Sequence, residues 1–211
     1  MEGFIMKRLV LASVTLLALA LAGCSSSANS NNSSSNKVSV AKGQNTSSSK
    51  ESSDSSEKIT YNYQDVSVLS KATYPVSYSD NSWAGTTVGI DKVTVYRVKP
   101  FTDANKKTYQ GLVTAHFKIH TTRDISIYPS QGTLVTSDGQ QVDGTNFSGD
   151  DFDGQISKDV DRDGTVVWAL EKMDDPRSLK TIRLKWSANY DTDDMEDDNA
   201  NKDYDATINL Q

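Results

Sequence analysis

The alternation of apolar and polar residues between Tyr109 and Thr121 is the strongest pattern in this chain. Every second residue from Val113 to Ile119 is apolar, whereas the residues between them include His116 and Lys118. A repeat of two residues places the apolar side chains on one side of an extended chain, and no helix would gather them there. The stretch therefore predicts a β-strand with one buried and one exposed face.

Shorter stretches of the same kind follow one another through the region 58–211. They are Ile59–Leu69, Thr87–Val98, Ile125–Tyr128, Leu134–Val135, Gln140–Val142, Gly164–Leu170, Leu179–Tyr190 and Tyr204–Leu210. Asp138-Gly139 predicts a hairpin turn because both residues tolerate positive φ, and a change of phase near Asp91-Lys92 predicts a β-bulge. Helical periodicity is nearly absent. The pattern predicts an all-β fold of two packed antiparallel sheets, a β-sandwich.

Three stretches between these strands predict irregular structure. Lys71–Ala84 is rich in polar residues and is expected to be an extended, irregular lead. Thr145–Asp163 is acidic and rich in glycine, and Asp191–Asp203 is strongly acidic, so we expect both to be loops. Trp168 and Trp186 lie on the apolar faces of their strands and are expected in the core.

The first residues of the chain have the pattern of an export signal. Lys7 and Arg8 precede the apolar run Val10–Ala22, and Met6 is an alternative start to Met1. An apolar run of about 7–15 residues is typical of a secretory signal, whereas a membrane-spanning helix needs about 20. A spanning helix is therefore the weaker interpretation.

The apolar run ends in Leu21-Ala22-Gly23-Cys24, which contains the only cysteine of the chain. This motif resembles the lipobox of bacterial lipoproteins. The resemblance implies that residues 1–23 are removed as a signal peptide, that Cys24 receives a diacylglyceryl thioether, and that the new N-terminus is acylated, for example with palmitate. Each buried CH₂ contributes about 0.8 kcal/mol, so two acyl chains hold a protein stably on a bilayer. The alternative is an ordinary signal peptide followed by an incidental thiol.

Ser and Asn dominate the segment Ser25–Glu57, which contains no aromatic residue. Such a composition buries too little apolar surface to offset the entropy of the chain. We therefore predict that residues 24–57 form a disordered, lipid-anchored linker with an r.m.s. span of about 30 Å. A recognition segment or a glycosylated stalk is the alternative.

The charge of the chain excludes some classes of partner. Removal of residues 1–23 takes away Lys7, Arg8 and Glu2 and leaves 20 basic and 27 acidic residues, a net charge of −7. This net charge disfavours binding of nucleic acid, which depends on basic patches that release counterions from phosphates. With Cys24 lipidated, no thiol remains for a disulfide, a thiolate metal site or a cysteine nucleophile.

Asp159, Asp161, Asp163 and Gly164 match the start of a D-x-D-x-D-G calcium loop. Such a loop places alternate carboxylates around Ca²⁺ and ends with a bidentate acid at its twelfth position. That position is Leu170 here. Two interpretations remain, a polar turn before a strand and a Ca²⁺ site, with further acids at Asp150, Asp151 and Asp153. We expect no other cofactor.

Trp83, Tyr74 and Tyr78 lie in polar sequence that shows no clear alternation. Aromatic residues in such a setting are candidates for an exposed binding surface, because their rings are not assigned to an apolar face. We therefore predict that these three residues form a binding surface for a protein or a cell-wall component.

No set of catalytic residues is evident from the sequence. His116 and His120 are about 13 Å apart along one strand, too far for one metal ion, and we interpret both as exposed sheet histidines. No serine lies in a G-x-S-x-G motif. The acids between Asp191 and Asp198 are interpreted as a solvated loop or, alternatively, as an anionic patch for cations or a basic partner.

Five stretches between Trp83 and Leu210 together resemble a family of unknown function found among lipoproteins of Gram-positive bacteria. They are Val88-Gly-Ile-Asp-Lys-Val, Leu112-Val-Thr-Ala-His-Phe-Lys-Ile, Leu134–Gly139, Gly164-Thr-Val-Val-Trp-Ala-Leu and Ile182-Arg-Leu-Lys-Trp. The family joins a lipobox and a Ser-rich linker to an immunoglobulin-like sandwich, similar to the antiadhesin-like fold of a small secreted mycobacterial immunogenic protein. The resemblance implies an immunoglobulin-like domain over 58–211 and no catalytic residues.

These observations favour a non-enzymatic surface domain, held to the outer face of the cell membrane through Cys24 and binding a protein or wall component. The first alternative is an envelope lipoprotein that binds divalent cations through its acidic loops. A small hydrolase is disfavoured because no nucleophile–base pair is evident. A solute-binding transport lipoprotein is disfavoured because about 150 ordered residues are few for two lobes. We expect a monomer that binds no nucleic acid.

Overall fold

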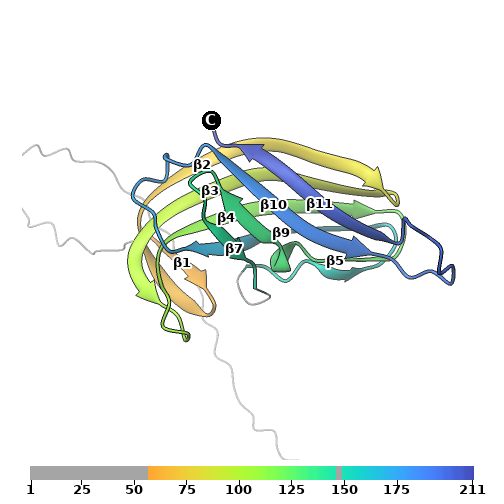
Figure 1. Cartoon of the computed structure of the whole chain (residues 1–211), viewed down its shortest axis with the longest axis horizontal. Helices are drawn as coiled ribbons and strands as arrows, with labels where there is room; N and C mark the ends of the chain where they lie inside the picture. The colour runs from red at the N-terminus through yellow and green to blue at the C-terminus, as the bar shows by residue number, and fades with distance from the viewer. Residues whose placement is uncertain (1–56, 146–148) are drawn as a thin grey trace, which may run out of the picture. The chain divides into compact units, whose positions relative to one another are not determined.

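Two antiparallel sheets make up the described part of the chain (Figure 1). The computed structural model describes residues 57–145 and 149–211. The first sheet has the order β1-β2-β3-β4-β9. Its strands are β1 (Lys58–Tyr61), β2 (Gln64–Trp83), β3 (Thr86–Thr102), β4 (Thr108–Thr121) and β9 (Val160–Leu170). The strands that follow one another in sequence, β1 to β4, lie side by side.

The second sheet is built on β10 (Thr181–Asn189). One edge of β10 pairs along its whole length with β11 (Asn201–Asn209), and its other edge pairs with two short strands in succession. Those are β5 (Ile125–Ile127) and β6 (Thr133–Thr136), separated by the 3₁₀ turn η1 (Pro129–Gln131). Beyond them, β8 (Gly154–Ile156) pairs with β5, and β7 (Gln141–Asp143) pairs with β6.

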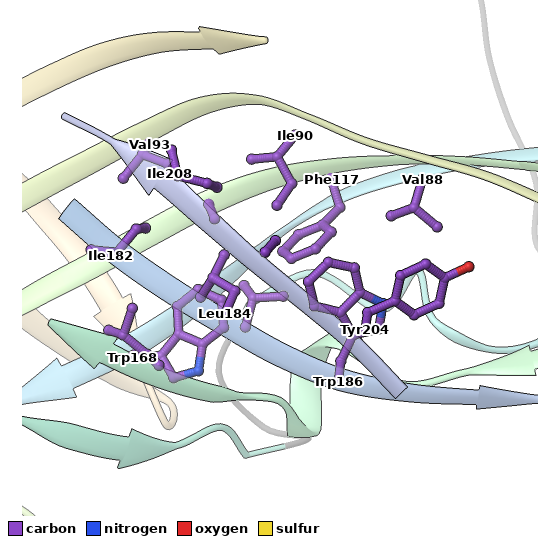
Figure 2. Packing of buried hydrophobic residues seen from close by; sticks show 14 of the residues in the cluster. Val88, Ile90, Val93, Phe117, Trp168, Ile182, Leu184, Trp186, Tyr204 and Ile208 are labelled. Carbon is purple, nitrogen blue, oxygen red and sulfur yellow. The ribbon is translucent and has the colours of Figure 1, made fainter. Parts of the chain in front are cut away.

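The main hydrophobic core lies between the two sheets (Figure 2). Phe117 and Val93 come from the first sheet, and Trp186, Leu184 and Ile208 come from the second. All of them are buried. Burial of one such side chain contributes about 1.5–3 kcal/mol, and the domain has no disulfide, so this core carries most of its stability.

A second apolar cluster lies on the other face of the first sheet. Tyr61 of β1 packs edge-on against Phe101 and Tyr109, with ring centroids 5.8 and 6.1 Å away. Leu112 and Val167 are buried in the same cluster. The hairpin of β1 and β2 therefore covers one end of this outer face, and the remainder of the face is polar.

The main features of the predicted fold are confirmed. The described part of the chain is an all-β sandwich of two antiparallel sheets, and Trp168 and Trp186 are in its core. The register between β3 and β4 shifts between Ile90 and Lys92, where the bulge is predicted. Strands β6 and β7 pair across the Asp138-Gly139 turn, where Gly139 has a φ of 88°.

Three stretches differ from the prediction. Ile59–Leu69 is not one strand, since a turn at Asn62-Tyr63 separates β1 from β2. Lys71–Ala84 is not an irregular lead, since β2 continues to Trp83 and pairs with β3 across several register shifts. Thr145–Asp163 is not one loop, since it contains β8 and the first residues of β9. The apolar signal is absent from Lys71–Ala84 because β2 pairs with β1 only as far as Ser67, and beyond it one edge of β2 has no partner strand among the described residues and many of its side chains are exposed. It is absent from Thr145–Asp163 because residues 161–163 of β9 are exposed although they pair with β4.

Candidate functional site

The polar outer face of the first sheet brings together acids and bases from three strands. The pairing of β4 with β9 places His120 opposite Asp161 and Lys118 opposite Asp163. Asp91 is at the bulge of β3 beside His116 and Lys118. We call these six residues the histidine–aspartate face: Asp91, His116, Lys118, His120, Asp161 and Asp163.

His116 bridges two carboxylates on the strands that flank it. Its Nδ1 lies 2.8 Å from Asp91 Oδ1, and its Nε2 lies 3.4 Å from Asp163 Oδ2. A neutral imidazole can donate to only one of these carboxylates, whereas an imidazolium can donate to both. His116 thus links β3, β4 and β9 and leaves no ring nitrogen for a ligand.

Lys118 completes a charged pair with the same carboxylate that holds His116. Its Nζ donates to Asp91 Oδ2 at 2.7 Å. This hydrogen bond, together with the one to His116, lowers the pKa of Asp91 below its ordinary value. The same bond raises the pKa of Lys118. Asp91 therefore stays ionised in mildly acidic solution and keeps Lys118 and His116 in place.

His120 has a different environment from His116. Its Nδ1 lies 2.8 Å from Asp161 Oδ1, and within 57–145 and 149–211 no hydrogen bond or ion pair involves its Nε2. A carboxylate on Nδ1 orients an imidazole so that Nε2 can exchange a proton or a hydrogen bond with a ligand. In the described part of the chain no serine or threonine hydroxyl is hydrogen-bonded to this nitrogen.

A hollow of about 530 Å³ lies beside His120. Gly89 and Thr87 of β3 and Lys118, His120, Asp161 and Asp163 are among its lining residues. A Cβ on Gly89 would be no closer than 3.6 Å to its nearest neighbour, the carbonyl oxygen of Tyr78. The glycine therefore leaves open space on the sheet surface, into which the free Nε2 of His120 and the two carboxylates can reach.

A second groove of about 590 Å³ lies on the same sheet, toward the apolar cluster. Its lining includes Lys71, Lys92 and a row of threonines, of which Thr73 and Thr94 share a hydrogen bond of 3.2 Å. Lys71 is paired with Glu57 at 2.6 Å. Lys92 has no ion pair among the described residues, so this end of the face offers one cation to a ligand.

The aromatic surface expected at Trp83, Tyr74 and Tyr78 does not form. Trp83 is 5% exposed, stacks on Tyr190 and donates from Nε1 to the carbonyl oxygen of Asn199 at 2.7 Å. The expectation that it is exposed is therefore wrong, because β2 turns its ring into the sandwich. Tyr74 and Tyr78 are partly buried and pack on the core. Burial, followed by the charge of Asp80, raises the pKa of Tyr78 to about 12.

Asp159, Asp161 and Asp163 do not form the loop that the calcium motif requires. Asp159 precedes β9, and Asp161 and Asp163 are within it, facing His120 and His116. An extended strand spreads alternate carboxylates apart along its length, whereas the calcium loop wraps them around one ion. The described residues contain no group of three or more His, Cys, Asp or Glu side chains suited to one metal ion.

The acidic segment between β10 and β11 is a loop, as predicted, but the last three residues of the predicted range Asp191–Asp203 belong to β11. Tyr190 OH donates to Asp197 Oδ2 at 2.8 Å, and Asp194 and Asp197 accept hydrogen bonds from nearby backbone N–H groups. Several of its carboxylates therefore stabilise the loop itself.

The predicted signal peptide 1–23, the lipidation site Cys24 and nearly all of the linker lie outside the described residues. Among the residues that are described, no helix has the length and hydropathy of a membrane span.

The partners of the two histidines are the functional feature that sequence reasoning missed. Asp161 and Asp163 alternate directly before the predicted strand Gly164–Leu170. If that strand is extended by four residues toward the N-terminus, both carboxylates lie on one of its faces. The identity of the neighbouring strand was not available, because the pairing of β4 with β9 joins residues about 40 positions apart.

Comparisons with known proteins leave the family of this chain open. No family model matches the sequence, and no curated protein matches it. Among solved structures, the chain is similar to a functionally unknown protein from Listeria monocytogenes EGD-e, with a TM-score of 0.44 and 14% sequence identity. The match covers 70% of this chain and 89% of that protein.

Proposed function

We propose that this chain is a lipid-anchored extracytoplasmic protein whose β-sandwich is a non-enzymatic binding module. The anchor is proposed on the sequence, from the lipobox at Cys24 and the linker that follows it. The binding surface is proposed on the structure, as the histidine–aspartate face. The partner is a protein or a wall component that presents both donors and acceptors.

The observation that carries the proposed surface is the open hollow beside His120. It combines a free imidazole nitrogen, two carboxylates and an ammonium group on a rigid sheet. Rigid, preorganised polar groups lose little entropy on binding. The ion pair of Lys118 with Asp91 and the contact of His120 with Asp161 hold three of the side chains that border the hollow.

The anchor is tested by replacing Cys24 in the full-length chain. The C24A variant should incorporate no fatty acid, and it should be found either in the medium or as an uncleaved precursor of higher mass. A C24S variant serves as a second thiol-free control, and metabolic labelling with a fatty acid reports the lipid directly. If the wild type incorporates no fatty acid, or if both variants are cleaved and held in the membrane fraction as the wild type is, the anchor proposal is wrong.

The surface is tested by site-specific photo-crosslinking on intact cells. A photoreactive residue at Thr87, on the histidine–aspartate face, should give a discrete crosslinked product, whereas one at Lys185, on the outer face of the other sheet, should not. The G89L substitution should fill the hollow and abolish the product from Thr87. Equal crosslinking from both positions, or a product that G89L leaves unchanged, would refute this surface.

A further inference from the structure

Strand β11 uses only one of its two edges. The N–H of Leu210 donates to the carbonyl oxygen of Lys180 at 2.8 Å, and the N–H of Tyr190 donates to that of Ala200 at 3.0 Å. In an antiparallel pair the N–H and C=O of one residue point the same way and alternate from residue to residue. The even-numbered residues of β11 therefore direct their backbone groups to β10.

The odd-numbered residues of β11 direct their backbone groups to the opposite edge. These residues are Asn201, Asp203, Asp205, Thr207 and Asn209. Within 57–145 and 149–211 no strand pairs with this edge. The edge thus presents a row of N–H and C=O groups at the spacing of a β-ladder.

Strand β2 lies along this edge but leaves it unpaired (Figure 1). The two strands are joined at one end, where Lys202 Nζ donates to Ser82 Oγ at 3.2 Å. At the other end a groove of about 490 Å³ separates them, between Pro75–Tyr78 and Thr207–Asn209. Pro75 has no N–H and the register of β2 shifts after it, so β2 is a poor template for a new strand and β11 is a good one.

The side chains of β11 define which segment would fit. Asp203 and Asp205 are exposed on the outer face. Arg183 donates to Asp205 from Nε and a terminal nitrogen, whereas Asp203 has no ion pair among the described residues. Ala206 and Ile208 face the core. In a strand paired with this edge, side chains would alternate between two environments. Those on the outer face would lie near Asp203, and those on the inner face would lie near Ala206 and Ile208.

We propose that the free edge of β11 binds an extended polypeptide segment in which basic and apolar residues alternate. The backbone of the segment would continue the ladder of β11, its basic side chains would meet Asp203, and its apolar side chains would enter the groove between β2 and β11. Main-chain hydrogen bonds supply affinity in such strand addition, and alternate side chains supply specificity. This site is independent of the histidine–aspartate face.

The first experiment measures amide hydrogen exchange by NMR on the chain without its signal peptide. The N–H groups of Tyr204, Ala206 and Ile208 should exchange slowly, and those of Asp203, Asp205 and Thr207 should exchange fast. Addition of an eight-residue peptide of alternating Lys and Val should slow the exchange of the second set. Protection of the odd-numbered residues before any peptide is added would overturn the proposal.

The second experiment measures binding of the same peptide, labelled with fluorescein, by anisotropy. A peptide of the same sequence with N-methyl groups on alternate residues is the control for main-chain pairing, and it should bind at least about tenfold more weakly. T207P removes the backbone N–H of residue 207, which points to the free edge and is not bonded to β10. T207V keeps this N–H and is the matched control. T207P should weaken binding about tenfold and T207V should not, with equal melting temperatures of the two variants as the check on folding.

The charge requirement is tested separately with D203K, at an exposed position. This variant should weaken binding of the Lys/Val peptide, and raised salt should have a similar effect on the wild type. Equal binding of the N-methylated peptide, or no effect of T207P and D203K, overturns the proposal. So does concentration-dependent dimerisation abolished by T207P, because the occupant of the edge would then be a second copy of the chain.

Discussion

The rings of Trp186 and Tyr204 stack almost in parallel, with centroids 4.9 Å apart and 9° between their planes (Figure 2). They come from adjacent strands, β10 and β11, and are directly opposite in the register. Both side chains are buried, and among the described residues neither Trp186 Nε1 nor Tyr204 OH has a hydrogen-bond partner. A buried polar atom without a partner costs free energy, so the stack combines good ring packing with two unfavourable polar atoms.

We predict that Y204F leaves the protein at least as stable as the wild type. The substitution keeps the stacked ring and removes an unpaired hydroxyl, so the free energy of unfolding should rise by up to about 1 kcal/mol. Y190F is the matched control, because it removes a hydroxyl that donates to Asp197, and it should lower stability. Urea unfolding at pH 7 compares the two; a Y204F variant less stable than Y190F would contradict the prediction.

The buried tyrosines predict a loss of stability in alkaline solution. Burial raises the pKa of Tyr204 and raises the pKa of Tyr78 to about 12, from an ordinary value of 10.0. Between pH 10 and about pH 12 the unfolded chain releases these protons and the folded chain keeps them, so stability is complete below pH 10 and falls as pH rises. Urea midpoints from pH 9 to 11.5 should fall less steeply for Y78F than for the wild type. Identical slopes would show that Tyr78 does not contribute.

Asp91 predicts the opposite dependence at acidic pH. Its pKa is lowered by the hydrogen bond from Lys118 and then by His116, so the stability it contributes is present above about pH 4 and is lost as pH falls through the lowered pKa. D91N should therefore be less stable than the wild type at pH 7, by less than about 1 kcal/mol because the pair is exposed. The difference should vanish in strong acid and shrink at high salt. A difference that is constant with pH would contradict this role.

Two glycines of the first sheet should respond differently to alanine. G89A should be nearly neutral, because its Cβ has an ordinary van der Waals contact of 3.6 Å. G164A should lower the free energy of unfolding by about 1–3 kcal/mol, because its Cβ would overlap the buried ring of Phe152. Thermal unfolding of the two variants checks the contrast. Equal melting temperatures would mean that the Phe152 ring moves aside without cost.

The strand position of Asp161 and Asp163 predicts that Ca²⁺ does not stabilise the domain. Addition of Ca²⁺ to about 1 mM, where weak extracellular calcium sites fill, should leave the melting temperature of the wild type and of D161N unchanged. Calorimetric titration provides a second measurement. A rise in melting temperature that D161N abolishes would restore the calcium interpretation.

The sequence determined the strands whose two faces differ. Val113 to Ile119 alternate strictly because one side of β4 packs in the core, whereas the other side becomes exposed from His116 onward. The same alternation holds for Ile182, Leu184 and Trp186 of β10. The sequence also predicts the Asp138-Gly139 turn and the bulge at Asp91, because each depends on a few adjacent residues.

Only the tertiary structure decided which strands are neighbours. The pairing of β4 with β9 gives His116 and His120 their carboxylates, and the inward turn at the end of β2 buries Trp83 against Tyr190. The free edge of β11 exists because β2 lies beside it without pairing. Such contacts join residues tens of positions apart, and their free energy depends on the three-dimensional packing that no local pattern of residues records.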